Sequence, residues 1–368
     1  MSIGSYAEHI RFIPFGVSNQ IPTDRHARQQ RVEFVGSEGQ AKLAESHAFI
    51  VGVGALGCVS ADLLVRAGVG KVTIVDRDLV ELSNLHRQPL YCERDAMEKR
   101  PKAVAAKARL NAVNSGVEVM AHIADFTAEN ALELVQSEGR VPDVLIDGTD
   151  NFETRFLLND CSVKLGVPYV YGGAIASKGS AAVFVPGSGP CLRCIEPDPP
   201  KPGTQPTCET AGVLAPVSSI IGSYQAAEAM KILMGQHDRV MKSMLSFDLW
   251  EGARTRVDLS SAQDAECPCC GLERFTFLES QDGAPQALCG QNAVQVKPGG
   301  AGMIDLEQLG ASLGESGEFE VHDYMIRGRI EHGGDVFELT CFADGRAIVD
   351  GTADVGVARA IYSRYIGS

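Results

Sequence analysis

Residues 47–76, HAFIVGVGALGCVSADLLVRAGVGKVTIVD, constrain the fold of this chain more than any other stretch. The apolar run at residues 48–51 is typical of a buried parallel strand. Three glycines follow in the spacing G-x-G-x-x-G, at Gly52, Gly54 and Gly57. This spacing turns a strand tightly into a helix and leaves backbone N–H groups facing a phosphate. We therefore predict the first strand and helix of a nucleotide-binding βαβ unit.

The second half of this segment completes the unit. A helix is expected over residues 55–66, ended by Gly68 and Gly70, and a second strand over residues 72–75. Asp76 follows that strand directly, in the position where a carboxylate accepts a ribose hydroxyl. The ordered combination makes an ordinary surface loop a poor alternative. It indicates an adenine nucleotide, and by itself it does not discriminate between NAD and ATP.

Composition limits the class of protein. A length of 368 residues with 45% hydrophobic residues fits a soluble globular α/β protein of two domains, or of one large domain with an appendage. A formal net charge of −14 argues against general affinity for nucleic acid or an anionic membrane. No secretory signal or apolar run of about 20 residues is recognisable, so we expect a cytoplasmic protein. Eleven Cys in that compartment favour metal or thiol chemistry over disulfides.

The polar segment after the second strand supplies candidate phosphate ligands. Ser83, Asn84 and Arg87 lie in an irregular stretch, and Lys102 follows Pro101, which is expected to open the next helix. In a doubly wound sheet this region lies at the carboxyl ends of the strands, where ligands bind. Arg87 and Lys102 are suited to clamping a triphosphate, the guanidinium through paired hydrogen bonds and the ammonium as a point charge. Taken singly, each is also open to interpretation as surface charge.

Further strands and helices alternate along the chain, which predicts a doubly wound, mostly parallel, Rossmann-like α/β sheet. They are expected at residues 117–123, 128–137, 143–146, 152–165 and 169–171. The strand at 143–146 runs into DGTDNFETR, which places Asp147 and Asp150 where an acid can hold Mg²⁺ against phosphate oxygens. For Asp150 the competing interpretation is the N-cap of the helix that starts near Asn151. A hydride-transfer enzyme does not need this second acidic motif.

Two C-x-x-C pairs indicate a structural zinc site. The pairs are Cys191 with Cys194, and Cys267 with Cys270. A tetrahedral site of four thiolates needs two such pairs, since each pair spans one edge of the tetrahedron. A redox C-x-x-C would need a single pair at a helix N-terminus, so zinc is favoured. Cys269 is ambiguous because it is able to replace a neighbour as ligand.

A further cysteine, Cys208, lies between the two pairs. It belongs to the Pro/Gly-rich segment DPPKPGTQPTCETAGV, which precedes a helix expected at residues 216–234. Such a loop can swing towards an activated acyl group, and a thiolate is a competent nucleophile for that group. The alternatives are a bystander thiol and a fifth candidate zinc ligand.

In this order the motifs resemble the ThiF/MoeB (HesA/MoeB/ThiF) adenylyltransferases, which are related to ubiquitin-activating enzymes. The resemblance covers residues 25–271 and depends on GVGALG, VDRDLVELSNLHRQ, PK, DGTDN, CLRC, CETAGVLAPVSSIIGSYQAAEAMK and CPCCG. It implies ATP-dependent adenylation of the C-terminal Gly-Gly carboxylate of a ubiquitin-like sulfur carrier of the ThiS or MoaD type. The products would be an acyl-AMP and pyrophosphate, for sulfur transfer in thiamin or molybdopterin biosynthesis. A sulfur donor, such as a cysteine desulfurase, is an implied partner.

The resemblance also assigns roles to residues. It implies that Asp76 holds the ribose, that Ser83 to Arg87 and Lys102 hold the phosphates, and that Asp150 holds Mg²⁺ beside Asn151. It implies that Arg28 reaches the nucleotide of a partner subunit, which requires a homodimer; from the residues alone, Arg28 lies on a solvated basic helix that Asp24 begins. Ala55 stands where the family often has a further glycine, and a backbone N–H still serves there. The nucleotide-binding set is therefore Arg28, Gly52, Gly54, Ala55, Gly57, Asp76, Ser83, Asn84, Arg87, Lys102, Asp150 and Asn151, and the catalytic set is Arg87, Lys102, Asp150 and Cys208.

The chain is expected to divide into three parts. Residues 1–23 form an N-terminal lead-in, residues 24–272 form the adenylyltransferase domain, and residues 280–368 form a small α/β module without an assigned role. In the module, strands are expected near 293–296 and in EFEVHDYMIRGRI, VFELTCF and RAIVDG, with helices near 305–313 and in VGVARAIYSRYI.

Two other functional classes remain as alternatives. An NAD-dependent dehydrogenase would account for the glycine loop and Asp76, but it leaves Lys102, DGTDN and the cysteine pairs unexplained. A catalytically inert, zinc-stapled adaptor that binds a ubiquitin-like protein would account for the cysteines. The complete set of phosphate ligands argues against the adaptor.

Overall fold

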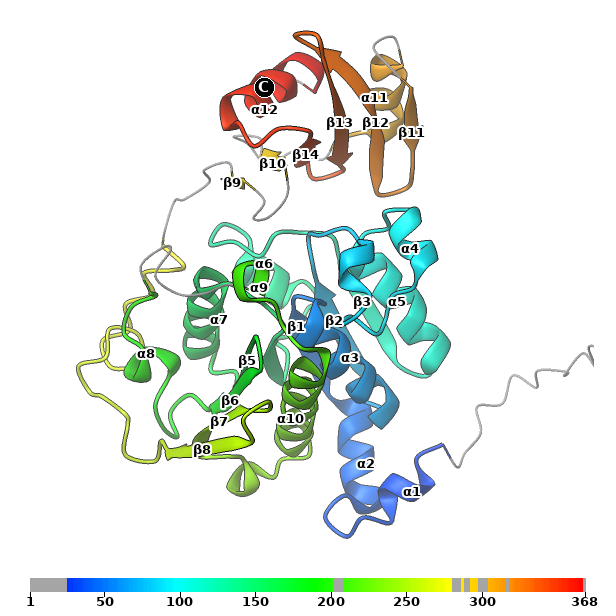
Figure 1. The fold of residues 1–368 in the computed structure, drawn as a ribbon. Helices are drawn as coiled ribbons and strands as arrows, with labels where there is room; N and C mark the ends of the chain where they lie inside the picture. Colours follow the sequence, from blue (N-terminus) through cyan, green and yellow to red (C-terminus); the bar gives the residue numbers. More distant parts are fainter. Residues whose placement is uncertain are drawn as a thin grey trace, which may run out of the picture.

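The computed structural model describes residues 25–200, 208–279, 286–287, 292–296, 304–314 and 318–366. These residues form two sheets, a large one flanked by helices and a smaller antiparallel one near the C-terminus (Figure 1). The predicted class, a mostly parallel α/β sheet with a small second module, is confirmed. The predicted lead-in and Asp24 lie outside the described residues. Within the described part, no helix is long and apolar enough to cross a membrane.

The large sheet has the order β3-β2-β1-β4-β5-β6-β7-β8. Its strands are β1 (His47–Val51), β2 (Lys71–Val75), β3 (Glu118–His122), β4 (Val144–Asp147), β5 (Tyr169–Ile175), β6 (Lys178–Phe184), β7 (Ser243–Asp248) and β8 (Ala253–Asp258). Strands β3 to β5 in this order are parallel, and β5 to β8 are antiparallel. The parallel strands therefore end at one edge of the sheet, where ligands of such folds bind.

Both faces of the central strands are covered, as their continuous apolar sequences predict. Ala48 and Ile50 of β1 belong to the core on one face, and Phe49 and Val51 to the core on the other. The first core is completed by α2 (Gly36–Glu45), α3 (Ala55–Ala67), α5 (Lys102–Val113) and α10 (Ala215–Leu233). The second is completed by α6 (Ala131–Gln136) and α7 (Phe152–Leu165).

Some elements differ from the expectations. The hairpin of β7 and β8 was not predicted, and every residue of β8, an edge strand, is exposed. Pro101 is the N-cap of α5, one position before the helix that it was expected to open. The remaining short elements are α1 (Ala27–Gln30), η1 (Leu82–Asn84), α4 (Glu93–Met97), α8 (Leu192–Ile195), α9 (Cys208–Ala211) and η2 (His237–Arg239).

The C-terminal module is an antiparallel sheet with the order β11-β12-β13-β14-β10-β9 and two helices. Its elements are β9 (Gln286–Ala287), β10 (Ala293–Val296), α11 (Leu306–Leu313), β11 (Phe319–Val321), β12 (Met325–His332), β13 (Asp335–Phe342), β14 (Ala347–Asp350) and α12 (Val355–Tyr365). Asp305 and Asp354 cap the two helices through their carboxylates. The module has its own apolar core. The domain boundaries expected near residues 272 and 280 stay a prediction.

The module packs against the edge of the large sheet where β2 and β3 end (Figure 1). Leu79 and Ile123, which follow these strands, contact a buried apolar group of the module that includes Met325, Phe342 and Ile348. The contact removes apolar surface from water, which stabilises the arrangement.

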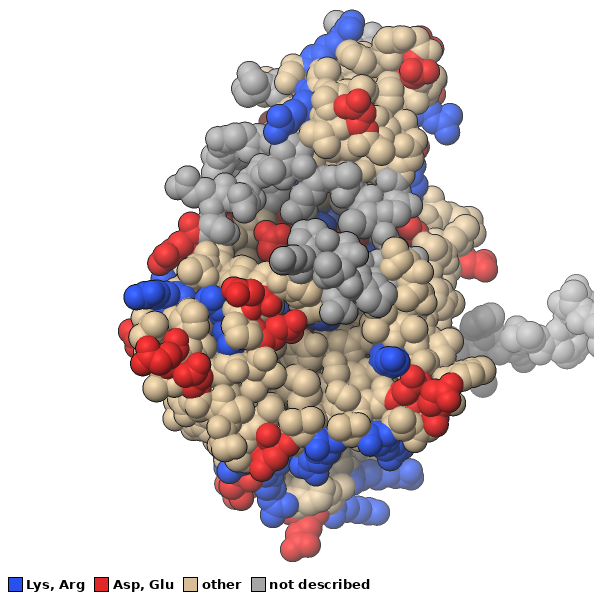
Figure 2. All heavy atoms as spheres, turned by 60° about the vertical axis from the view of Figure 1, so that its left-hand side comes forward, with Lys and Arg blue, Asp and Glu red and all other residues tan. Residues whose placement is uncertain are grey.

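Figure 2 shows basic and acidic side chains interspersed on one face of the molecule. On the described surface of this face they do not gather into a single basic area. The expectation that nucleic acid is not a partner stays a prediction.

Candidate active site

The glycine loop is packed tightly against the loop that follows β4. Gly52 has a φ of +84°, which lies in the left-handed region that favours glycine. A Cβ atom on Gly57 would lie 1.9 Å from the carbonyl oxygen of Gly52, and one on Gly148 would lie 2.0 Å from the same oxygen. These glycines therefore let the β1–α3 and β4–α7 loops touch.

Gly54 differs from its neighbours because packing does not require a glycine there. The nearest atom to a Cβ on Gly54 is the oxygen of Gly148, at 3.8 Å. Gly54 is also the N-cap of α3, and it has no side chain to accept a hydrogen bond from the first turn, which contains Ala55. The first N–H groups of a helix attract anions. This geometry suits a close approach of phosphate, and the assignment of Gly54 and Ala55 to the nucleotide stays a prediction.

Asp76 is held rigidly at the carboxyl end of β2. It is 8% exposed, and its two carboxylate oxygens accept the backbone N–H groups of Val53 and Asp78, each at 2.8 Å. Burial raises the pKa of Asp76 to about 6, although Lys102 opposes this effect. The carboxylate is therefore preorganised next to the glycine loop, as a ribose ligand must be.

Lys102 is buried, and its ammonium lies among carboxylates. Its Nζ donates to Oδ2 of Asp78 at 2.8 Å, and its backbone N–H donates to the carbonyl of Asp78 at 2.8 Å. Burial would lower the pKa of Lys102, but Asp78, Asp76 and Asp150 outweigh burial and raise it. Burial would likewise raise the pKa of Asp78, but Lys102 and then Arg77 lower it to about 2. The sequence interpretation missed Asp78, although an acid two positions after Asp76 was a visible signal.

The residues of η1 and its surroundings make local hydrogen bonds. Oδ1 of Asn84 accepts the N–H of Glu81 at 3.1 Å, and the hydroxyl of Ser83 donates to Glu81 at 3.0 Å. Arg87 is half-buried, and its Nη1 donates to the carbonyl of Ser83 at 2.8 Å. This bond uses one of the five N–H donors of the guanidinium. Phosphate binding by Ser83, Asn84 and Arg87 stays a prediction.

The two acids after β4 lie in different surroundings. Asp147 is fully buried and accepts the N–H and hydroxyl of Thr149, at 2.9 and 2.6 Å, and the hydroxyl of Tyr169, at 2.9 Å. Arg155 lies 3.3 Å away as its ion-pair partner. Burial raises the pKa of Asp147, while Arg155 opposes that rise. Asp147 therefore fixes the loop and is not placed to hold Mg²⁺.

Asp150, in contrast, is exposed. The interpretation of Asp150 as the N-cap of α7 is wrong, because Oδ1 of Asn151 accepts the N–H of Thr154 at 2.8 Å and so caps the helix. An exposed carboxylate beside Lys102 has the donor chemistry that Mg²⁺ prefers. Its role as the Mg²⁺ ligand stays a prediction, as does the role of Asn151 at the nucleotide.

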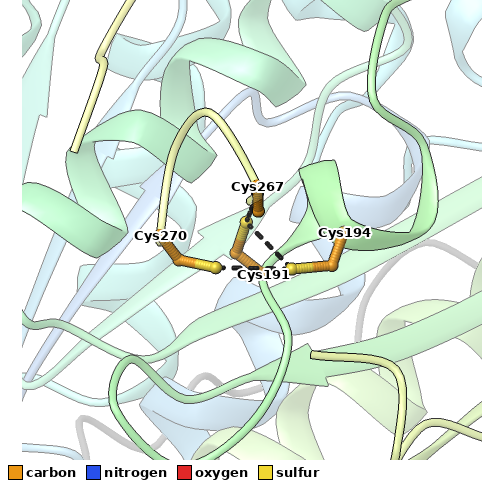
Figure 3. Close-up of side chains that lie close together, drawn as sticks. All are labelled: Cys191, Cys194, Cys267 and Cys270. Carbon is orange, nitrogen blue, oxygen red and sulfur yellow. Dashed lines mark hydrogen bonds between the residues drawn. The ribbon is translucent and has the colours of Figure 1, made fainter. Parts of the chain in front are cut away.

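Cys191, Cys194, Cys267 and Cys270 form a compact cluster (Figure 3). Their four Sγ atoms all lie within 4.8 Å of one another, with the shortest separations at 3.3 Å and 3.6 Å. A tetrahedron with Zn–S bonds of about 2.3 Å has edges of about 3.8 Å. The four sulfurs therefore fit a closed tetrahedral zinc site.

Cys269 lies beside this cluster. It is fully buried, and Nδ2 of Asn159 donates to its Sγ at 3.3 Å. Oδ1 of the same Asn159 accepts the N–H of Leu192 at 2.8 Å. Asn159 of α7 thus links Cys269 to the backbone between Cys191 and Cys194. The compact group formed by the other four sulfurs favours Cys270 over Cys269 as the fourth ligand.

Two predicted site residues, Cys208 and Arg28, are not seen beside the glycine loop. Cys208 begins α9, which packs against β5, and its side chain is outside the described residues. Arg28 is exposed on α1, whose neighbours His26 and Gln29 contact the carbonyls of Arg66 and Ala67. Those carbonyls mark the far end of α3, a helix of 13 residues. At 1.5 Å per residue this end lies about 18 Å from the glycine loop, so Arg28 cannot reach the loop of its own chain.

The fold and site define a nucleotide-binding α/β protein, and comparisons identify its family. The family model described as "ThiF family" matches residues 26–269, and the chain belongs to this family. The "Sulfur carrier protein ThiS adenylyltransferase" of Bacillus subtilis (strain 168) is 42% identical over 347 residues, which cover 94% of this chain and 100% of that protein. The chain is accordingly an adenylyltransferase, and the dehydrogenase alternative is rejected.

A second relative is the "Sulfur carrier protein adenylyltransferase" of Thermus thermophilus. It is 42% identical over 255 residues, which cover 68% of this chain and 91% of that protein. Among solved structures, E. coli MccB with ATP has a TM-score of 0.56 at 20% identity, covering 67% of this chain and 74% of that chain. That likeness concerns the fold alone.

Proposed function

We propose that this enzyme adenylates the C-terminal Gly-Gly carboxylate of a ubiquitin-like sulfur carrier of the ThiS type, for sulfur transfer in thiamin biosynthesis. The observation that carries the proposal is the buried ammonium of Lys102, which interacts with Asp76, Asp78 and Asp150 beside the glycine loop. At one edge of the sheet, this arrangement places an acid suited to accept a ribose hydroxyl, a cation suited to bind phosphate and an acid suited to bind a metal ion. The full-length match to the Bacillus subtilis relative favours a ThiS-type carrier over a MoaD-type carrier.

The reaction joins two anions, so the site must neutralise charge and align the reactants. A carboxylate oxygen of the carrier attacks the α-phosphorus of ATP, the bond from that phosphorus to the bridging oxygen breaks, and pyrophosphate leaves with the electron pair. Asp76 holds the ribose, the N–H groups of the glycine loop hold phosphate, and Lys102 and Arg87 offset the negative charge. When bound to Asp150, Mg²⁺ supplies further charge neutralisation on the phosphates.

The active form is proposed to be a homodimer. Arg28 lies about 18 Å along α3 from its own glycine loop, which is beyond the reach of an arginine side chain. A second copy of the chain would supply its Arg28 to the nucleotide, as the resemblance to the family implies. Cyclic dimers are the commonest closed assemblies of identical chains.

The acyl-adenylate is proposed to pass to sulfur through Cys208. Its thiolate would displace AMP and form a thioester with the carrier, which a sulfur donor such as a cysteine desulfurase would then resolve. A Cys208→Ser variant should keep pyrophosphate exchange and lose any thiol-sensitive carrier conjugate. Unchanged sulfur transfer would leave Cys208 as a bystander, with the adenylate handed directly to the donor.

The principal test is exchange of labelled pyrophosphate into ATP, with a Gly-Gly-ended carrier and Mg²⁺. Lys102→Ala and Asp150→Ala should each lower the exchange rate about 100-fold or more, since each removes charge stabilisation of the transition state. Lys107→Ala, on the same helix as Lys102, should exchange at the wild-type rate. Carrier binding without exchange would contradict the proposed reaction with that carrier.

A further inference from the structure

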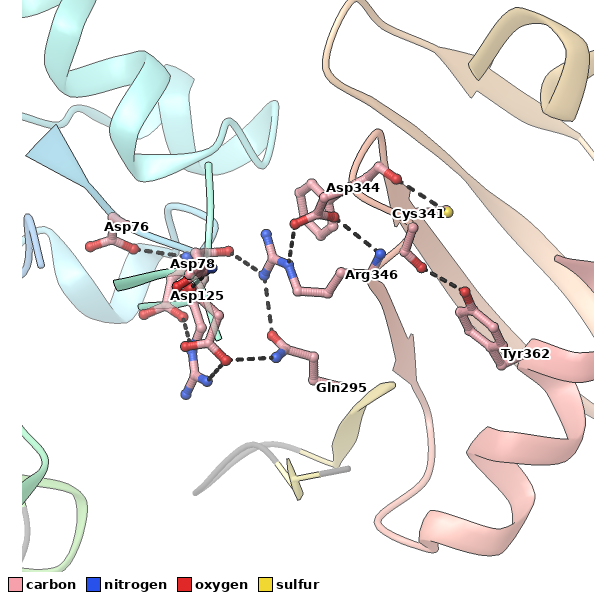
Figure 4. A network of polar contacts seen from close by, with 12 residues as sticks. Asp76, Asp78, Asp125, Gln295, Cys341, Asp344, Arg346 and Tyr362 are labelled. Carbon is pink, nitrogen blue, oxygen red and sulfur yellow. Dashed lines mark hydrogen bonds and ion pairs between the residues drawn. The ribbon is translucent and has the colours of Figure 1, made fainter. Parts of the chain in front are cut away.

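The C-terminal module brings a buried arginine to the edge of the nucleotide site (Figure 4). Arg346 is 2% exposed, and it precedes β14. Its Nη1 donates to the carbonyl of Arg77 at 2.9 Å and to Oε1 of Gln295 at 3.1 Å. Arg77 is the residue between Asp76 and Asp78, so the module holds the backbone of the segment that is proposed to bind the ribose.

The same network holds the side chain of Arg77. Nη1 of Arg77 donates to Oδ2 of Asp125 at 3.1 Å, and Nε2 of Gln295 donates to the same oxygen at 3.4 Å. Asp125 follows β3, and Gln295 belongs to β10 of the module. Residue 77 is therefore fixed at its carbonyl and at its guanidinium by one continuous set of contacts.

Burial of Arg346 costs more free energy than burial of an apolar residue would. Among the described residues, its Nε and Nη2 have no hydrogen-bond partner, and Nε lies 3.6 Å from Asp344. Its guanidinium packs over the ring of Phe342 at 4.1 Å from the ring centre. Unsatisfied buried donors cost free energy, so an apolar residue at this position would stabilise the module more if packing were its only role. The structure therefore favours a positioning role for the hydrogen bond from Nη1 of Arg346 to the carbonyl of Arg77.

Other contacts fix the module around the same segment. Leu79, two residues beyond Arg77, packs into the apolar group of the module. On the other side, Lys99 donates to Glu338 of β13 at 3.0 Å. The Asp76–Asp78 segment is thus flanked by module contacts, while Asp78 in turn anchors the ammonium of Lys102.

We propose that the C-terminal module completes the nucleotide-binding site of its own chain, with Arg346 as a positioning residue. Arg346 holds the Asp76–Asp78 segment in the conformation in which Asp76 meets the ribose and Asp78 orients Lys102. The inference rests on the proposed function only in placing ATP at the glycine loop. Because linkage is reciprocal, ATP must also strengthen the docking of the module.

The test uses the full chain with Arg346→Ala, Arg346→Lys and the control Arg359→Ala, an exposed arginine of the same module. We expect Arg346→Ala to weaken the Kd for ATP, measured calorimetrically with Mg²⁺, and to raise the KM for ATP by about tenfold, within the usual range of coupling between sites. The KM for the carrier should change less than about twofold. Arg346→Lys, which keeps the charge and hydrogen-bond donors but not the planar guanidinium, should weaken the Kd for ATP about threefold. Arg359→Ala should leave the Kd unchanged.

A second measurement separates positioning from simple stabilisation. ATP should slow amide hydrogen exchange in β10 and β14 of the wild type, and this protection should disappear in Arg346→Ala. A folded Arg346→Ala protein with wild-type ATP affinity would overturn the inference. If the alanine variant fails to fold, wild-type ATP affinity in Arg346→Lys would overturn it. ATP binding that depends on Arg346, together with a wild-type protein that fails to exchange pyrophosphate with every Gly-Gly-ended carrier tested, would refute the proposed function and leave this inference standing.

Discussion

At the scale of single residues, burial and the neighbouring cation shift the pKa values of Asp76 and Asp78 in opposite directions. Burial raises the pKa of Asp76 to about 6, whereas Lys102, against the effect of burial, brings the pKa of Asp78 down to about 2. Near pH 6, Asp78 therefore remains ionised while Asp76 is partly protonated. A ribose hydroxyl donates more strongly to a carboxylate than to a neutral carboxyl group.

This difference predicts a pH dependence of ATP binding. As the pH rises from about 5 to about 7, Asp76 ionises and the Kd for ATP should improve by about fivefold, the gain expected from one charge-assisted hydrogen bond. Calorimetry across this range measures it. Because ATP itself titrates nearby, Asp76→Asn serves as the reference, and it should bind more weakly with a flatter profile. Parallel profiles for both proteins would remove Asp76 from the ribose.

Several of these residues were predictable because they lie in short motifs. Asp76 was expected directly after a strand and Lys102 at the start of a helix, which the structure confirms, while their roles at the nucleotide stay predictions. Asp150 and Asn151 were harder to assign, since both residue types cap helices and only the backbone geometry shows that Asn151 does so. Arg346 gave no signal, because its partner Arg77 lies far away in the sequence.

At the scale of elements, α7 connects the acidic loop to the cysteine cluster. Asp150 and the capping Asn151 directly precede it, and Arg155 pairs with Asp147 in its first turn. A turn later, Asn159 contacts Cys269 and the N–H of Leu192, beside the cysteine cluster. The helix was predicted with its observed bounds, Phe152–Leu165. The strand β8 was missed because ARTRVD is short and only weakly apolar: one face has Ala253, Thr255 and Val257 and the other has charged residues, and the whole edge strand is exposed.

The cysteine cluster predicts a bound zinc ion, and substitutions of ligand and non-ligand cysteines should have different effects on the zinc content. Purified protein should hold about one zinc per chain, as a closed four-thiolate site does. Cys267→Ser should lose the metal and lower the free energy of unfolding, whereas Cys269→Ser should keep it. Elemental analysis and thermal unfolding measure both effects. Loss of zinc from Cys269→Ser as well would make Cys269 a ligand.

The glycine loop predicts a contrast between two neighbouring glycines. Gly57→Ala should destabilise the protein by about 3 kcal/mol or more, because its Cβ would lie 1.9 Å from the oxygen of Gly52. Gly54→Ala should unfold within about 2 °C of the wild type and bind ATP about tenfold more weakly, because only the ligand needs that space. Thermal unfolding and ATP titration test the pair. Normal ATP affinity in Gly54→Ala would place the phosphates elsewhere.

At the scale of the whole molecule, the proposed nucleotide site lies between parts that are distant in the sequence. The C-terminal module packs where β2 and β3 end, while Arg28 lies at the opposite end of α3. Apart from the two-residue strand β9, the strands and helices of the module were predicted from their patterns. Its docking was not, because Leu79 and Ile123 look like ordinary apolar residues in the sequence.

The position of Arg28 predicts complementation between inactive subunits. Arg28→Ala and Asp150→Ala should each be nearly inactive in exchange. When the two are co-expressed, half of the dimers are mixed, and each mixed dimer has one intact site, so about a quarter of the wild-type activity should return. No recovery from two inactive variants would mean that Arg28 does not complete the site of a partner subunit. Analytical ultracentrifugation of the mixture checks that dimers form.

The exposed edge strand β8 has a consequence for how the protein behaves in concentrated solution. An open sheet edge offers backbone groups to any extended chain, and such edges seed aggregation unless they carry charge. In β8, Arg254, Arg256 and Asp258 alternate with smaller residues, and all are exposed. These charges discourage edge-to-edge pairing between copies. A polar sequence that weakens the strand as a predictable element therefore protects the protein against self-assembly into fibrous aggregates.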